Sequence, residues 1–244
     1  MFQQYQMSAL SGMSSFSFWD FFSAGQKNGC ELGEAAMRKR LQNMLKSGEV
    51  VRVGRNAYCV PQNGVRPYHH TYSEEAIQVA QAVHKAYPAV EFTIFELVQL
   101  NEFVNHQLAH NVLFLSVEDD IIDFIFDLLK EQFPGKVLLD PTPELYHQYW
   151  YDGMIVLIKM VTEAPKGIDE NWHTRLEKML VDLVSDSLLQ EVISKSEYTA
   201  IFEGAFSSYV IDESCLFRYA KRRAAEKRLK ALIQEKTNIT LRTE

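Results

Sequence analysis

The stretch GEAAMRKRLQNMLKSGEVVRVGRNAYCV, residues 33–60, decides the fold that we expect at the N-terminal end of this chain. Its apolar spacing predicts a helix that ends at Ser47-Gly48, because glycine commonly follows the C-terminus of a helix. A strand over Glu49–Val53, a turn at Gly54–Asn56 and a returning strand over Ala57–Val60 are expected next. A basic helix followed by such a hairpin is typical of a winged helix-turn-helix.

The predicted helix has an apolar face and a polar face, given ~100° of rotation per residue. One narrow sector, which we expect to be buried, holds Met37, Leu41, Met44, Leu45 and Gly48. We expect the apolar segment FSFWDFF, residues 16–22, to cover that sector. The opposite sector holds small, amide and cationic side chains, namely Ala35, Arg38, Lys39, Gln42, Asn43 and Lys46.

This polar face is suited to the major groove of DNA. There the first turns of a helix reach base edges while Lys and Arg neutralise phosphates. The hairpin adds Arg52, Arg55 and Asn56, which lie where a wing contacts phosphate or the minor groove. The sequence therefore predicts double-stranded DNA as the partner. Two alternatives stay open: a solvated surface helix beside a hairpin, and a winged helix used as a protein-interaction module.

Charge is distributed unevenly along the 244 residues. The formal net charge is −7, which by itself argues against a nucleic-acid partner. However, residues 1–66 carry 8 basic and 4 acidic side chains, residues 67–217 carry 8 and 25, and residues 218–244 carry 9 and 3. A basic N-terminal part on an acidic body is typical of a protein in which one part alone faces the phosphate backbone.

The turn-rich segment 61–67 (PQNGVRP) marks a domain boundary. We expect a winged helix-turn-helix over residues 1–66, an α/β domain over 67–170, and a helical C-terminal region over 171–244 that packs on the α/β domain. Strands and helices alternate in the middle part, which predicts a small mixed or parallel sheet. The fold class that we expect is therefore α/β for this part and α+β for the chain as a whole. The strands are expected at 91–97, 111–117, 136–140 and 154–161, and the helices at 73–87, 101–110 and 118–133.

Sequence motifs of catalysis are missing: the chain has no G-x-G-x-x-G, P-loop or G-x-S-x-G pattern. His106 and His110 share the spacing that zinc sites use on a helix, but Gln107 stands where a metalloprotease has its general base. No third ligand is evident, and His69-His70 is expected at the surface. We therefore expect no catalytic residue, no metal and no cofactor.

A metal-dependent nuclease of the PD-(D/E)xK type is a minor alternative, and it leaves the α/β domain open as an enzyme. Such an enzyme needs an acidic residue and then acid-x-Lys on the next strand. Lys159 lies on a predicted strand, but Leu157 occupies the acidic position. Asp140 and Asp152 are better explained as strand-end and turn residues.

The cysteines and the apolar runs predict a cytoplasmic location. Cys30, Cys59 and Cys215 lie far apart without a CxxC pair, as expected of reduced thiols. No apolar run approaches the length of a membrane span, and the polar opening MFQQYQMSALSGM has no charged region before an apolar stretch. Met7 and Met13 are alternative start positions within it.

The basic run Arg218–Arg223, continued by Lys227, Arg228 and Lys230, has three interpretations. It is a solvated helix face, a second DNA contact, or a surface for an acidic partner or for the acidic body itself. Apolar residues between the cations, such as Leu216 and Leu229, favour a helix that packs on the body.

Three segments resemble the AbiEi family of type IV antitoxins and related transcriptional regulators. They are V-x-R-x-G-R-x-x-Y-x-V at Val50–Val60, the strand entry His110-Asn111-Val112, and L-E-K-M-L-V-D-L at Leu176–Leu183. The segment Phe217–Arg223 is similar to an uncharacterised Bacteroidetes-like branch of these proteins. Asn56 departs from the family, which usually has glycine there, although asparagine tolerates positive φ.

The resemblance implies autoregulation: the protein binds repeats at its own promoter and opposes a nucleotidyltransferase-like toxin. The residues that match as DNA contacts are Arg38, Lys39, Gln42, Arg52 and Arg55. We also expect a homodimer, from the two-fold geometry of winged-helix operators rather than from a heptad pattern.

Overall fold

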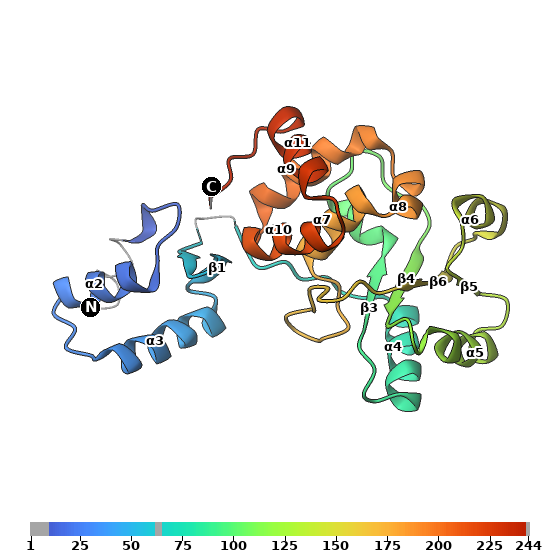
Figure 1. Ribbon diagram of the computed structural model, residues 1–244, viewed down its shortest axis with the longest axis horizontal. Coiled ribbons are helices and arrows are strands. Elements are labelled where there is room, and N and C mark those ends of the chain that lie inside the picture. The colour runs from blue at the N-terminus through green and yellow to red at the C-terminus, as the bar shows by residue number, and fades with distance from the viewer. Residues whose placement is uncertain (1–9, 62–64, 243–244) are drawn as a thin grey trace.

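The computed structural model describes residues 10–61 and 65–242 (Figure 1). Residues 10–61 form an N-terminal module that lies beside a larger body, residues 65–242. The start of the polar opening segment, including Met7, and the centre of the predicted boundary segment lie outside the described residues. No helix in the described part of the chain is long and apolar enough to cross a membrane.

The N-terminal module contains the helices α2 (Phe18–Lys27) and α3 (Glu34–Ser47), followed by a hairpin of β1 (Val51–Gly54) and β2 (Ala57–Cys59). The strands are antiparallel, and Gly48, with φ 75°, ends α3. Before α2, the backbone of Phe16 exchanges two hydrogen bonds with Tyr58 of β2, at 2.7 and 2.9 Å. The predicted helix and hairpin are therefore confirmed as elements.

Helix α2 covers the apolar face of α3, as predicted. Gly48 and Leu45 differ from the expectation because they are only partly buried, at the end of α3 that faces the body. The buried side chains of the module are Leu10, Phe16, Phe18, Phe21, Met37, Leu41, Met44 and Val50.

The body is built on a four-stranded mixed sheet in the order β3-β4-β6-β5, one of the two outcomes expected from the sequence. Its β3–β4 pair is antiparallel, and β4–β6 and β5–β6 are parallel. Every residue of β4 is buried, which explains its continuous apolar sequence. The strands are β3 (Phe92–Glu96), β4 (Val112–Val117), β5 (Val137–Leu139) and β6 (Met154–Lys159).

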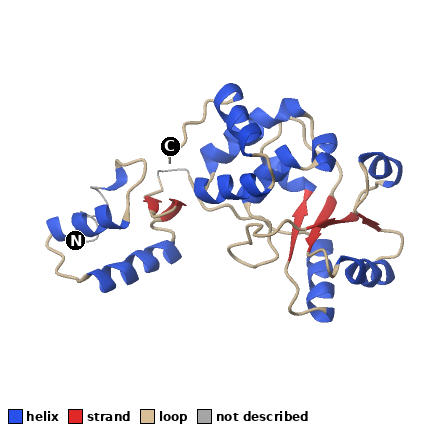
Figure 2. Cartoon of the chain, viewed as in Figure 1, coloured by secondary structure: helices blue, strands red, loops and turns tan. Residues whose placement is uncertain are grey.

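Helices pack on both faces of this sheet (Figure 2). One face packs against α4 (Glu74–Ala86) and α5 (Ile122–Gln132). The other face packs against the C-terminal helices, so one continuous core joins the sheet to them. These helices are α7 (Leu176–Ser185), α8 (Ser187–Val192), α9 (Tyr198–Ser208), α10 (Glu213–Arg222) and α11 (Glu226–Lys236), with the short 3₁₀ turn η2 (Lys195–Glu197) before α9.

The helix predicted at residues 101–110 is wrong. A 3₁₀ helix, η1 (Leu97–Glu102), ends at the start of that range, and an irregular loop follows it. The amide of Asn101 accepts a hydrogen bond from Leu108 N at 2.6 Å and donates one to Leu108 O at 3.0 Å, which holds the loop in a non-helical shape. Helix α6 (Pro143–Tyr149), which Thr142 caps, was not predicted from the sequence.

Candidate nucleic-acid interface

One face of α3 is open to solvent, opposite the face that packs on α2. Apart from Arg38, its predicted side chains make no ion pair or hydrogen bond within the described residues. They are therefore available to an external partner without first breaking an internal contact. Five of the six residues predicted there are both exposed and without such a contact, namely Ala35, Lys39, Gln42, Asn43 and Lys46.

Arg38 is the sixth predicted residue, and it is held within the module. Its Nη2 lies 2.7 Å from Glu34 Oε1, and its guanidinium stacks over the Phe18 ring at 4.1 Å. Half of the Arg38 side chain is nevertheless exposed. A surface ion pair of this kind contributes at most about 1 kcal/mol, so a phosphate can replace Glu34 at small cost.

The hairpin residues have mixed roles. Arg52 Nε donates to Gly54 O at 3.0 Å and lies 3.9 Å from Asp212 Oδ2. Arg55 is exposed at the tip of the hairpin, and its backbone N–H donates to Ser214 Oγ at 2.9 Å. Asn56 has φ 53°, as its place in the turn predicts, but its Oδ1 accepts a hydrogen bond at 3.3 Å from the backbone N–H of Phe18, the first residue of α2.

The hairpin is docked on the body, which sequence reasoning missed. Val51, Val53 and Cys59 form a small apolar cluster with Val210, the residue that precedes α10 by three positions. Arg66, in the predicted boundary segment, pairs its backbone with Ser208 and Val210. No sequence signal marks this contact, because Val210 and Ser214 are ordinary residues of a helix start.

The basic C-terminal run divides into a paired group and a free group. Arg223 lies 3.3 Å from Asp182 and 3.1 Å from Asp186, and Arg222 pairs with Glu163. These residues tie α10 to the body and support the structural interpretation. The exposed cations that make no ion pair within the described residues are Arg218, Lys221, Lys227 and Arg228.

Three of the four histidines considered as metal ligands, His69, His70 and His106, pair with carboxylates. His69 is exposed as predicted, but His70 is half-buried, and its Nε2 lies 3.0 Å from the buried Glu96. His106 pairs with Glu197 at 3.0 Å, while His110 packs on a tryptophan ring. Because residues 103–111 form a loop, His106 and His110 do not share a helical face. In the described chain, no group of three or more His, Cys, Asp or Glu side chains is placed to hold a metal ion.

The residues considered for a nuclease occupy ordinary positions. Lys159 at the end of β6 pairs with Asp119 at 2.8 Å, and Leu157 is buried in the sheet. Asp152 accepts a hydrogen bond from Asn111 N at 2.8 Å, as expected of a turn residue. Asp140 follows β5 with φ 38°.

Comparison with known proteins gives one family match. DUF6577, a family of unknown function, matches residues 36–239 of this chain by its family sequence model. No curated protein matches the chain. Among solved structures, the crystal structure of the RV2827C protein from Mycobacterium tuberculosis aligns with 95% of this chain and 80% of that chain, at 10% sequence identity and a TM-score of 0.25. That likeness is too low to transfer any property.

Proposed function

Since the chain belongs to DUF6577, a family of unknown function whose description names no enzymatic activity, we propose its function from its own geometry. We propose that it binds double-stranded DNA through the exposed face of α3 and through the hairpin. The observation that carries this proposal is the open face of α3, where Lys39, Gln42 and Lys46 have no partner within the described residues. Cations and amides together suit phosphates and base edges respectively.

The order of elements in the module supports a winged helix-turn-helix. Leu10 and Ser11 are helical, Phe16 forms a bridge with β2, and α2, α3 and the hairpin follow. In a helix-turn-helix the second helix of the pair enters the major groove, which is the place of α3 here. The hairpin then takes the place of the wing, with the exposed Arg55 at its tip.

We further propose that DNA binding serves transcriptional regulation, as in the AbiEi-like antitoxins that the wing sequence Val50–Val60 resembles. In that role the protein represses its own promoter and opposes a nucleotidyltransferase-like toxin. Binding as a dimer to repeated half-sites fits the two-fold geometry of such operators. The neighbouring gene gives a direct check, because a nucleotidyltransferase-like product is expected there.

The test is the affinity of the full chain for the DNA upstream of its own gene, measured by fluorescence anisotropy over a range of salt concentrations. The triple variant Lys39→Ala, Gln42→Ala, Lys46→Ala should bind at least about tenfold more weakly, and its salt slope should fall by about 2, one for each lost cation. The matched control is Lys85→Ala with Lys136→Ala, two exposed cations of the body. Equal binding by wild type and triple variant would contradict the proposal.

A protein-interaction module is the second candidate, favoured by one observation on the body. Four large apolar or aromatic side chains on and after α6 are exposed, and clusters of that kind are typical of protein contacts. Co-purification with a neighbouring gene product, without any DNA shift at low salt, would favour this function. The four residues are Leu145, Tyr149, Trp150 and Tyr151.

A further inference from the structure

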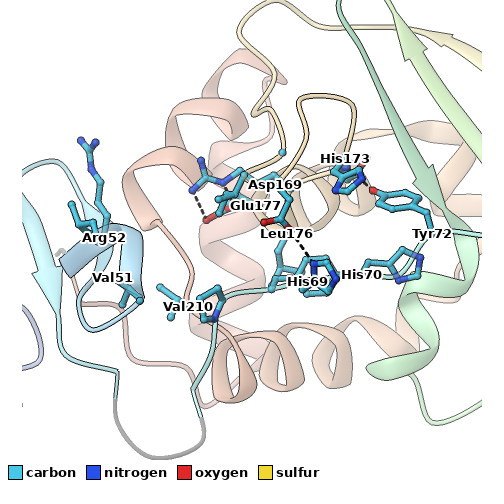
Figure 3. Close-up of a pocket in the computed structure, with 18 of the residues that line it drawn as sticks. Val51, Arg52, His69, His70, Tyr72, Asp169, His173, Leu176, Glu177 and Val210 are labelled. Atoms are coloured by element: carbon cyan, nitrogen blue, oxygen red, sulfur yellow. Dashed lines mark hydrogen bonds and ion pairs between the residues drawn. The ribbon is translucent and has the colours of Figure 1, made fainter. Parts of the chain in front are cut away.

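A cavity of ≈ 190 Å³ lies between the N-terminal module and the body (Figure 3). Leu45 at the end of α3 and Val51 at the start of β1 form one wall. The segment His69–Tyr72, together with His173 and Val210, lines the body side. The cavity therefore exists only because the hairpin is docked on the body.

The charged side chains on the body wall are paired with each other. Arg175 Nε lies 2.8 Å from Glu177 Oε2, and His69 Nδ1 lies 2.9 Å from Asp169 Oδ2 (Figure 3). An ion that entered the cavity would find no unpaired opposite charge on this wall. Because burial of an unpaired ion is costly, the wall favours an uncharged ligand.

The same wall offers aromatic faces and free ring nitrogens. The centroid of the His173 ring lies 4.5 Å from that of Tyr72, with the planes tilted by 30°, and 4.3 Å from that of Trp172 in an edge-to-face contact. Neither ring nitrogen of His173 makes a hydrogen bond within the described residues. Burial lowers the pKa of His173, so its imidazole is neutral near pH 7 and presents one donor and one acceptor. His70 forms a hydrogen bond to Glu96 through Nε2, and its Nδ1 makes no hydrogen bond within the described residues. The Tyr72 hydroxyl, in contrast, already donates a hydrogen bond to Ile94 O.

We propose that this cavity binds a small uncharged aromatic compound with one hydrogen-bonding group, a ligand of the phenol class. The size fits, since a cavity of about 150 Å³ lined by apolar side chains binds benzene, and ≈ 190 Å³ leaves room for one substituent. Leu45, Val51 and Val210 supply apolar contact for the ring, and His173 supplies the polar partner.

Such a ligand contacts the module and the body at once. Ligand binding therefore stabilises the docked position of the hairpin. The stabilisation equals the difference between the binding free energies of the ligand for the docked and the undocked arrangement. The site lies apart from the open face of α3, because Leu45 is partly buried, whereas Lys39, Gln42 and Lys46 are exposed. Arg52 of the hairpin lines the cavity as well, 3.9 Å from Asp212.

The first experiment measures thermal unfolding of the full chain at pH 7 with phenol as the probe. Phenol should raise Tm in a saturable way, by roughly 3–6 °C at ten times its Kd. Benzoate and benzylammonium have the same ring with opposite charges, and both should leave Tm unchanged. Equal stabilisation by the charged probes, or no saturable effect of phenol at millimolar concentration, overturns the proposal.

Two variants test whether phenol binds in this cavity. Val210→Trp fills it and should abolish the phenol effect. Since this change can also displace the hairpin, His173→Phe is the second variant, because it keeps the stacked ring and removes both nitrogens. It should weaken phenol binding roughly 3- to 10-fold, the effect of one hydrogen bond, and leave toluene binding unchanged in titration calorimetry. Unchanged phenol affinity in His173→Phe would show that phenol binds elsewhere.

Discussion

The backbone N–H of Arg55 donates a hydrogen bond to the hydroxyl of Ser214 at 2.9 Å, and this contact joins segments 159 residues apart. It ties the tip of the hairpin to the first turn of α10. The body therefore holds the N-terminal module not only through the continuing chain but also through this contact, its apolar neighbours and the approach of Arg52 to Asp212. The docked hairpin fixes where the exposed Arg55 side chain can meet a partner.

Ser214→Ala should loosen the hairpin without unfolding the protein. A single hydrogen bond contributes about 0.5–1.5 kcal/mol, so Tm should fall by no more than a few degrees. Hydrogen exchange at residues 51–59 should become faster, because the hairpin then opens more often. Ser207→Ala, which removes a local hydroxyl contact to Gly204 O on α9, is the matched control. Unchanged exchange in the hairpin would show that the apolar contacts alone hold it.

The free cations of α10 test the second-contact interpretation of the basic run. Arg218 and Lys221 lie one and two turns beyond Ser214, about 6 and 10 Å along the helix axis. If bound DNA extends past the wing tip, Arg218→Ala with Lys221→Ala should weaken binding and lower the salt slope by about 2. Wild-type salt dependence in this variant would assign both residues to a solvated face.

A buried polar cluster under α10 should be essential for folding. Lys178 Nζ lies 2.7 Å from Asp182 Oδ2, and the Tyr219 hydroxyl donates to Asp182 Oδ1 at 2.9 Å. Asp182→Ala leaves the buried Lys178 ammonium without its counter-charge, which should lower the free energy of unfolding by about 3–5 kcal/mol, whereas Arg223 keeps its ion pair with Asp186. Urea unfolding of wild type and Asp182→Ala measures this difference in the free energy of unfolding.

The control for that change removes both charges of the central pair. Lys178→Met with Asp182→Leu should be less destabilising than Asp182→Ala alone, because no buried ammonium then lacks a counter-charge. A double variant that is as unstable as the single one would mean that packing, rather than charge, dominates at this position.

Glu96 should make stability depend on acid. Burial raises the pKa of this carboxyl, but hydrogen bonds from His70, Ser73 and Asn111 outweigh burial and hold its pKa below the ordinary value of 4.5. A depressed folded-state pKa stabilises the protein above the unfolded-state pKa, and this stability is lost as the pH falls through the lower, folded-state value. Urea unfolding between pH 7 and pH 3 should show a smaller acid loss in Glu96→Gln than in wild type. Identical profiles would contradict this role.

The N-terminal module could be predicted from local pattern because its core is made by neighbours in sequence. The spacing of Met37, Leu41 and Met44 marks a single buried stripe, and the next apolar segment upstream covers it. The strands of the sheet were recognisable for a related reason, since burial on both faces leaves a continuous apolar run such as that of β4. The loop after η1 could not be recognised from the sequence. Hydrogen bonds between the Asn101 side chain and the backbone of Leu108 replace helical ones there, and helix propensity does not reveal such bonds.

The sequence by itself determined the elements of the module, the exposed cationic face of α3 and the basic-to-acidic division of the chain. These follow from periodicity and composition, which are local properties. Only the tertiary structure decided that the hairpin docks on α10, that Asn56 accepts a hydrogen bond from the first N–H of α2, and that a cavity lies between module and body. Each of these depends on contacts between residues 38 to 159 positions apart, and side chains such as Ser214 acquire a role only from what the fold places beside them.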